Sequence, residues 1–331
     1  MHNSSSNQRP YPTTFPRLHP LRLPQQTPHL PTVTMTLDMI PITLPNSKQF
    51  YLENARGEKH LIQISWPLHW TDEQPPADSG PLPILYIVDG NALFLTATEA
   101  AWRRAVMSDF TGGGLIVAIG YPLTGTGNVY DFPRRSRDLT PPTSDLAVPG
   151  HGGADEFLTF VTDTVRPAVR AAFPRVTCAR DALYGHSYGG LFALHALFTR
   201  PDTFDCYLAS SPSIWWNGRW ILEEARGFLD EERPSDGERV PPALMMFVGS
   251  WEQDPPRRRG ESDDAYEERR RMAADWRMRD NAFELAEMLR DCPAVHAVPV
   301  RVYEGEEHTS VMACSLNRGL TAFFEGWPFA W

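Results

Sequence analysis

Short, uninterrupted apolar segments alternate with amphipathic ones along this chain of 331 residues. The main apolar runs are 82–88 (LPILYIV), 115–120 (LIVAIG), 243–249 (ALMMFVG) and 298–303 (VPVRVY). Such strands are typical of a sheet that is buried on both faces. Segments with helical spacing of apolar residues lie between or after these runs, at 155–172, 188–199 and 316–324. The alternation predicts an α/β fold with a mostly parallel central sheet and helices on both faces.

The residues before the first buried run predict an N-terminal antiparallel hairpin. Segments 39–44 and 58–66 are strand-like, and a polar stretch at 53–57 that ends in glycine separates them. We therefore expect a single domain over 35–331 that starts with this hairpin. A charged segment near 252–280 interrupts the alternation, either as a solvated insertion or as the polar start of a long helix that reaches Leu289.

The first 34 residues have a different composition. They contain seven prolines, at positions 10, 12, 16, 20, 24, 28 and 31, and no acidic residue. Proline at this density prevents the amphipathic helix that an organellar targeting segment needs. We expect residues 1–34 to form a disordered tail.

Composition also bears on partners and location. The formal net charge is −10, and an acidic chain without long basic runs is a poor nucleic-acid ligand. The sequence contains no run of about 18 apolar residues, so we expect no membrane partner. The four cysteines form no CxxC pair, and no apolar signal segment is recognised. We expect a cytoplasmic protein with free thiols that requires neither a metal nor an organic cofactor.

Residues 185–190 read Gly-His-Ser-Tyr-Gly-Gly, a G-x-S-x-G pattern. In a nucleophile elbow, the serine occupies a tight turn between a strand and a helix, and side chains at the flanking glycines would collide with that turn. The apolar triplet 182–184 precedes the pattern, and a helical segment follows it. This context predicts that Ser187 is a catalytic nucleophile.

A serine hydroxyl needs a general base, and in α/β hydrolases the order along the chain is serine, acid, histidine. His296 and His308 are the two histidines far downstream of Ser187. His296 lies at the start of a predicted strand, which favours a structural role. His308 follows the end of that strand, where active-site loops gather, so we predict that it is the base.

The third member of a triad holds the imidazole in the required tautomer. Glu252 and Asp254 both follow the strand predicted at 243–249. We favour Glu252 and keep Asp254, or a serine–histidine dyad without an acid, as alternatives. For the oxyanion hole we expect the backbone amide of Tyr188 together with that of Asn91 or Gly90, which follow the first buried strand.

Several of these motifs together resemble the enterobactin and ferri-siderophore esterases, within the esterase-D-like group of α/β hydrolases. The resemblance covers roughly residues 36–326. It rests on 85–92 (LYIVDGNA), 120–122 (GYP), the arginine run to 138–140 (DLT), 152–158 (GGADEFL), 185–192 (GHSYGGLF), 210–216 (SSPSIWW) and 303–311 (YEGEEHTSV).

The resemblance implies an α/β-hydrolase fold and a serine esterase that opens a cyclic trilactone siderophore, in its ferric form, through an acyl-enzyme. Ser187 and His308 match the serine and histidine of the family, whereas its acid is less uniform. The expected cytoplasmic location is consistent with an intracellular member of the family, similar to the fungal esterases that open fusarinine-type trilactones. The tail and the charged segment depart from the compact bacterial pattern.

Candidate substrate contacts lie on two predicted loops. Tyr130, Arg134 and Arg135 follow the strand at 115–120. The resemblance implies that Arg134 or Arg135 contacts the siderophore. The structural alternative is a solvated basic loop, or pairing with Asp131 and Asp138. Trp215 and Trp216 follow the elbow helix and a further strand, and are either pocket walls or core residues.

Two alternatives to the siderophore esterase stay open. The same serine, base and acid would hydrolyse another macrolactone, or a polyketide or peptide thioester, in a differently shaped pocket. A ligand-binding protein without catalytic activity is the second alternative.

Overall fold

The computed structural model describes residues 39–70, 73–77, 79–106, 113–123, 127–142, 148–231, 240–297 and 299–325. Contacts divide the chain into two units, 1–43 and 44–331. Residues 39–43, the described part of the first unit, are exposed and form no strand. The tail predicted at 1–34 lies outside the described residues.

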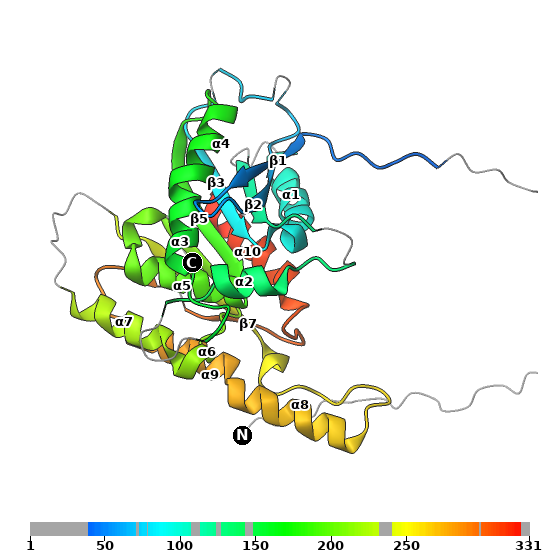
Figure 1. Cartoon of the computed structure of the whole chain (residues 1–331), viewed down its shortest axis with the longest axis vertical. Helices are drawn as coiled ribbons and strands as arrows, with labels where there is room; N and C mark the ends of the chain where they lie inside the picture. Colours follow the sequence, from blue (N-terminus) through cyan, green and yellow to red (C-terminus); the bar gives the residue numbers. More distant parts are fainter. Residues whose placement is uncertain are drawn as a thin grey trace, which may run out of the picture. The chain divides into compact units, whose positions relative to one another are not determined.

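In the second unit, the described strands form one sheet (Figure 1). It has nine strands in the order β1-β2-β4-β3-β5-β6-β7-β8, with β9 also paired to β7. β1 pairs antiparallel with β2, β2 pairs antiparallel with β4, and all other pairs are parallel. The strands are β1 (Ser47–Glu53), β2 (Lys59–Ser65), β3 (Leu82–Val88), β4 (Leu115–Gly120), β5 (Cys178–His186), β6 (Cys206–Ser210), β7 (Ala243–Gly249), β8 (His296–Ala297) and β9 (Arg301–Tyr303). The predicted mostly parallel sheet and N-terminal antiparallel hairpin are confirmed.

The first strand of the hairpin starts later than the sequence suggested. A strand was expected at 39–44, but β1 begins at Ser47 and pairs with β2 from Ser47↔Ser65 to Glu53↔Lys59. Pro41 and Pro45 each lack the backbone N–H that a sheet ladder needs. The prolines therefore keep this segment out of the sheet.

Helices cover both faces of the sheet, as predicted, and each face has its own hydrophobic core (Figure 1). On one face lie α1 (Gly90–Val106) and α10 (Val311–Glu325). On the other lie α3 (Ala154–Phe160) with its π-helical continuation (Val161–Val165), α4 (Arg166–Ala172), α5 (Tyr188–Thr199), α6 (Trp216–Arg219), α7 (Ile221–Asp230) and α9 (Met278–Met288). Within the described residues, no helix has both the length and the apolar character needed to cross a bilayer.

The charged segment forms two helices rather than one long helix. α8 (Asp263–Trp276) and α9 are separated by Arg277, whose φ of 48° is left-handed. Ser262 caps α8 through its side-chain oxygen, which accepts a hydrogen bond from the Ala265 amide at 3.3 Å. Only Ala273 of α8 is buried, so this helix adds little to the core.

The arginines that the sequence placed on a loop lie on α2 (Phe132–Asp138), so the loop location was wrong. The Asp131 side chain accepts a hydrogen bond from the Arg134 amide at 3.1 Å, and Pro133 occupies the first turn. An aspartate cap followed by proline is a helix start signal, which outweighs the loop-like composition around it.

Candidate active site

Ser187 occupies the turn between β5, which ends at His186, and α5, which begins at Tyr188. Its backbone is left-handed, with φ 60° and ψ −117°. A Cβ atom on Gly185 would collide with the backbone of Gly189, and one on Gly189 would lie 2.8 Å from a methyl group of Val88. The glycines are therefore required for this strand–turn–helix, which is the one that the sequence predicted.

Strained backbone gathers where three neighbouring strands end. Asp89, Ser187 and Ser211 directly follow β3, β5 and β6, and have φ angles of 55°, 60° and 42°. A residue other than glycine in this region costs about 1–3 kcal/mol, and such residues cluster at functional sites. The strain therefore marks the carboxyl edge of the sheet around Ser187.

Two of the predicted side chains meet at this edge. His308 follows β9, and its Nδ1–H donates a hydrogen bond to Oε2 of Glu252 at 2.6 Å. Its ring centroid lies 4.5 Å from that of His186, the residue before Ser187. Because an ionised carboxylate only accepts, the proton lies on Nδ1, and Nε2 of His308 is left with a lone pair. The Ser187 hydroxyl lies 3.4 Å from that of Ser213.

Glu252, in the 3₁₀ turn Ser250–Glu252 after β7, is only 6% exposed. Its Oε1 accepts hydrogen bonds from the Ser211 hydroxyl and the Gly249 amide, both at 2.6 Å. These donors and His308 compensate the buried charge. Asp254, the alternative acid, has a side chain that is 70% exposed and pairs with Arg279 at 3.0 Å.

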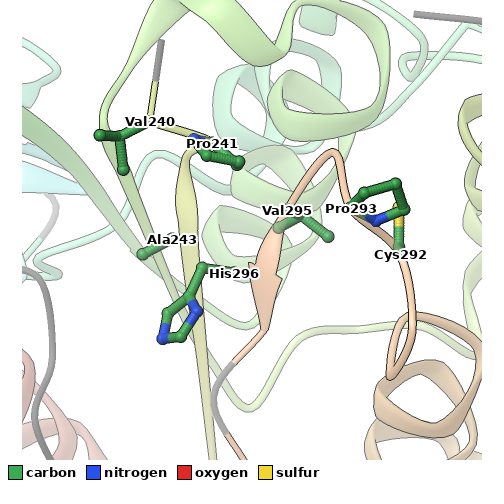
Figure 2. Close-up of a pocket in the computed structure, with 7 residues that line it drawn as sticks. All are labelled: Val240, Pro241, Ala243, Cys292, Pro293, Val295 and His296. Atoms are coloured by element: carbon green, nitrogen blue, oxygen red, sulfur yellow. The ribbon is translucent and has the colours of Figure 1, made fainter. Parts of the chain in front are cut away.

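His296, the alternative base, lies at the opposite edge of the sheet. It pairs in register with Ala243, the first residue of β7. Both residues line a pocket of about 300 Å³ (Figure 2). The other lining residues are Val240, Pro241, Cys292, Pro293 and Val295. His296 is thus at the amino ends of the strands, and Ser187 is at their carboxyl ends.

The predicted oxyanion donors lie at two neighbouring helix N-termini. α1 begins at Gly90 and α5 at Tyr188, after the paired parallel strands β3 and β5. Amides in the first turn of a helix have no partner within it and attract negative charge. The Asn91 side chain binds the Tyr121 backbone, accepting from its N–H at 2.8 Å and donating to its C=O at 3.0 Å.

A buried ion pair directly precedes α1, because Asp89 is the residue before Gly90. The Arg135 guanidinium donates to both carboxylate oxygens of Asp89 at 2.8–3.2 Å, and the two side chains are 9% and 3% exposed. The rings of Tyr130 and Tyr188 lie 5.3 and 5.4 Å from the guanidinium carbon. This pair was not predicted from the sequence, which offered Arg135 as a substrate contact, as part of a solvated loop or as a partner of Asp131 and Asp138.

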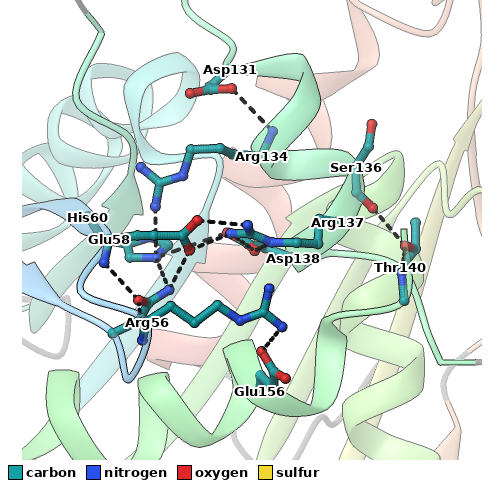
Figure 3. Close-up of polar contacts among 12 residues, drawn as sticks. Arg56, Glu58, His60, Asp131, Arg134, Ser136, Arg137, Asp138, Thr140 and Glu156 are labelled. Carbon is teal, nitrogen blue, oxygen red and sulfur yellow. Dashed lines mark hydrogen bonds and ion pairs between the residues drawn. The ribbon is translucent and has the colours of Figure 1, made fainter. Parts of the chain in front are cut away.

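Arg134 contacts the hairpin instead of the turn at Ser187 (Figure 3). It donates to the Lys59 carbonyl at 2.7 Å and to His60 Nε2 at 3.0 Å. Burial, followed by the charge of Arg134, lowers the pKa of His60 to about 3, so this imidazole is neutral and accepts. Arg137 pairs with Glu58 at 2.6 Å and with Asp138 at 2.9 Å. Both guanidinium groups therefore already have partners within the protein.

The two predicted tryptophans differ in exposure. Trp216 is 4% exposed, and its ring lies 6.0 Å from that of His151. Trp215 is partly buried, stacks on Trp276 of α8 at 5.1 Å and lies 6.2 Å from Tyr188. Trp215 thus joins the charged segment to the residue after Ser187. In the part of the chain that the structure describes, no cluster of three or more metal-ligating side chains occurs.

Comparison with known proteins yields consistent matches. The Esterase family model matches residues 54–282. A siderophore triacetylfusarinine C esterase of Aspergillus fumigatus is 64% identical over 289 residues, which cover 87% of this chain and 97% of the relative. A siderophore enterobactin esterase of Emericella nidulans is 45% identical over 286 residues, covering 83% and 92%.

A solved structure agrees with these matches. The siderophore hydrolase EstB from Aspergillus nidulans has a TM-score of 0.85 and 58% sequence identity, and the match covers 88% of this chain and 99% of that one. The shared fold is of the α/β-hydrolase type, as the resemblance implied. The chain belongs to the Esterase family.

Proposed function

We propose that this protein is a serine esterase that hydrolyses the ester bonds of a cyclic trilactone siderophore in its ferric form. The observation that carries the chemistry is the convergence of a serine elbow and a histidine–glutamate pair at one edge of the sheet. The substrate class follows from the A. fumigatus and E. nidulans relatives, whose names specify siderophore esters.

In the first half of the reaction, Ser187 Oγ attacks the ester carbonyl carbon while His308 Nε2 takes the hydroxyl proton. The carbonyl oxygen becomes an oxyanion that the amides of Tyr188 and of Asn91 or Gly90 stabilise. The C–O bond to the alcohol then breaks, and His308 returns the proton to the departing oxygen. The product is an acyl-enzyme on Ser187 and an opened ring.

In the second half, water adds to the acyl carbonyl while His308 takes its proton. The bond to Ser187 Oγ breaks, the serine regains a proton from His308, and the linear acid leaves. Glu252 keeps the Nδ1 proton in place and stabilises the imidazolium that forms twice in each cycle. Its three hydrogen bonds fix its own orientation.

On the substrate side, we propose that Trp215 and Tyr130 face the siderophore. Both flank Tyr188, Trp215 directly and Tyr130 through the Arg135 guanidinium. Arg135 supports the site through Asp89. Direct contact of the siderophore with Arg134 or with the buried Trp216 stays a prediction.

Covalent capture tests whether Ser187 is the nucleophile. A fluorophosphonate that reacts with activated serines is expected to add one phosphonyl group to the wild type and none to Ser187→Ala. His308→Gln is expected to react far more slowly, because the hydroxyl then lacks its base. Intact-protein mass spectrometry measures all three. Equal labelling of Ser187→Ala would contradict the assignment of Ser187 as the nucleophile. An unreactive wild type would contradict the proposed esterase and favour a ligand-binding protein.

A further inference from the structure

Helix α8 contributes little to the hydrophobic core, because Ala273 is its one buried residue. Figure 1 shows this helix outside the layers formed by the sheet and the helices that cover it. Ion pairs tie α8 to its own segment, since Arg269 binds Glu261 at 2.7 Å and Arg257 pairs with Asp263. Packing of the core therefore does not account for the presence of this helix.

The C-terminal end of α8 contacts the residues around the candidate active site. Trp276, the last residue of α8, stacks on Trp215 with ring centroids 5.1 Å apart and ring planes 10° apart. The ring of Trp215 in turn lies 6.2 Å from that of Tyr188, the residue after Ser187. Two successive ring contacts thus carry an aromatic surface from the serine turn to α8. Because Trp276 is still 36% exposed, this surface ends in solvent and not in the core.

The backbone that follows Trp276 holds this tryptophan in place. Arg277 adopts the left-handed φ of 48° that ends α8 and begins α9. Asn281, which is buried, donates a hydrogen bond from Nδ2 to the Trp276 carbonyl at 3.0 Å, and Met278 between them is buried as well. Residues other than glycine with such a backbone are held by their surroundings and cluster at functional sites. An exposed tryptophan therefore occupies a fixed position at the end of α8.

An aromatic surface beside the serine suits a substrate that is much larger than its reacting bond. When one ester of a trilactone lies at Ser187, the rest of the ring and its iron-binding arms must lie against the protein nearby. A tryptophan offers a large, rigid apolar face at a low cost in conformational entropy. Contacts with parts of the substrate that do not react favour the substrates that possess those parts. A small aryl ester has no such part.

We propose that Trp276 is a specificity-determining residue, which forms with Trp215 a platform for the part of the siderophore that is not being cleaved. Helix α8 then serves to carry Trp276 to the site. This inference rests on the proposed function, because it needs Ser187 as the point at which the ester is attacked. Trp276 exchanges no proton with the substrate and contacts no reacting atom.

The selectivity of the enzyme tests this role, measured as the ratio of kcat/KM for a ferric trilactone to kcat/KM for an aryl ester. We expect Trp276→Ala to lower this ratio by about 5- to 30-fold, mainly through a higher KM for the trilactone. Trp276→Phe keeps a ring and is expected to stay within about threefold of the wild type. A purely structural loss lowers both rates together and leaves the ratio unchanged.

Tyr266→Ala is the matched control, because Tyr266 is an aromatic residue of the same helix that packs within its own segment. Its ring lies 5.7 Å from the guanidinium carbons of Arg257 and Arg269. We expect the selectivity ratio of this variant to stay within about twofold of the wild type, since it leaves the stack of Trp276 on Trp215 in place. An equal fall of the ratio in Tyr266→Ala and Trp276→Ala would contradict a specific role of Trp276.

A binding measurement keeps the test valid even if Trp276→Ala disturbs α8. Trp276→Leu retains an apolar side chain against Trp215 but loses the flat face. In a Ser187→Ala background, which binds without cleaving, we expect it to raise the Kd of a ferric fusarinine-type trilactone about 5- to 30-fold by calorimetry. An unchanged ratio in Trp276→Ala, or an unchanged Kd in Trp276→Leu, would overturn the platform alone. A wild type that cleaves the aryl ester but no trilactone would instead overturn the siderophore function, and this inference with it.

Discussion

Glu252→Gln is expected to lower kcat by about 1,000- to 10,000-fold, the size of loss known for removing the charge of a triad acid. An amide at this position offers Nδ1–H of His308 a weaker acceptor, or presents it with a donor and reverses the tautomer. The carboxylate already has three short hydrogen bonds, so the amide also leaves the Ser211 hydroxyl or the Gly249 amide poorly matched. Pre-steady-state and steady-state kinetics on an aryl ester measure the loss.

Asp254→Asn is the matched control, because Asp254 is the other acid that the sequence offers after β7. Its exposed carboxylate pairs with Arg279, and exposed ion pairs contribute about 0–1 kcal/mol. We expect its kcat to stay within about twofold of the wild type. A large loss in Asp254→Asn combined with a small one in Glu252→Gln would reverse the assignment of the acid.

Arg135→Met is expected to destabilise the fold by about 3–5 kcal/mol, because it leaves the buried carboxylate of Asp89 without its partner. The loss also removes the cation between Tyr130 and Tyr188. Asp89 lies immediately before α1, so we expect activity to fall even in the folded fraction. Denaturant unfolding followed by fluorescence gives the free energy of unfolding.

The double variant Asp89→Asn/Arg135→Met distinguishes charge from shape. It removes both charges, and asparagine tolerates the left-handed backbone of residue 89, so most of the lost stability should return. Arg226→Ala, which disrupts an exposed pair with Glu223, provides the low baseline at under about 1 kcal/mol. Equal losses in Arg135→Met and the double variant would show that packing of the arginine, not its charge, matters here.

The structural features that the sequence predicted correctly, which are the turn that holds Ser187 and the edge of the sheet at which His308 lies, follow from local patterns. Ser187 lies in a short pattern in which the glycines, the preceding strand and the following helix each constrain the same turn. His308 was distinguished from His296 by its place after, rather than before, a strand. Parallel strands bring all their carboxyl ends to one edge, so that ordering along the chain predicts which residues share the site.

Local errors came from competing signals. Pro41 and Pro45 outweigh the apolar character of 39–44, and the cap at Asp131 with Pro133 outweighs the loop-like composition around Arg134. Arg277 splits the charged segment by adopting a left-handed conformation that its residue type does not announce.

The missed contacts are those between distant segments. Arg135 pairs with Asp89 across 46 positions, and Ser211 donates to Glu252 across 41. No sequence spacing predicts either contact. The first depends on where α2 packs against the end of β3, and the second depends on how β6 and β7 align. The contact between His186 and Ser210 could not be predicted for a related reason. His186 occupies a variable position of the G-x-S-x-G pattern, and this position says nothing about which residue of β6 lies beside it.

The most direct test of the account is mass spectrometry of wild type and Ser187→Ala incubated with a panel of cyclic trilactones. The panel contains ferric and iron-free fusarinine-type and enterobactin-type compounds beside a simple aryl ester. We predict linear, hydrolysed products from a ferric trilactone with the wild type and none with Ser187→Ala. Cleavage of the aryl ester alone would keep the hydrolase but contradict the siderophore assignment, and would favour another macrolactone or a thioester. Trilactone cleavage by Ser187→Ala would contradict the serine mechanism.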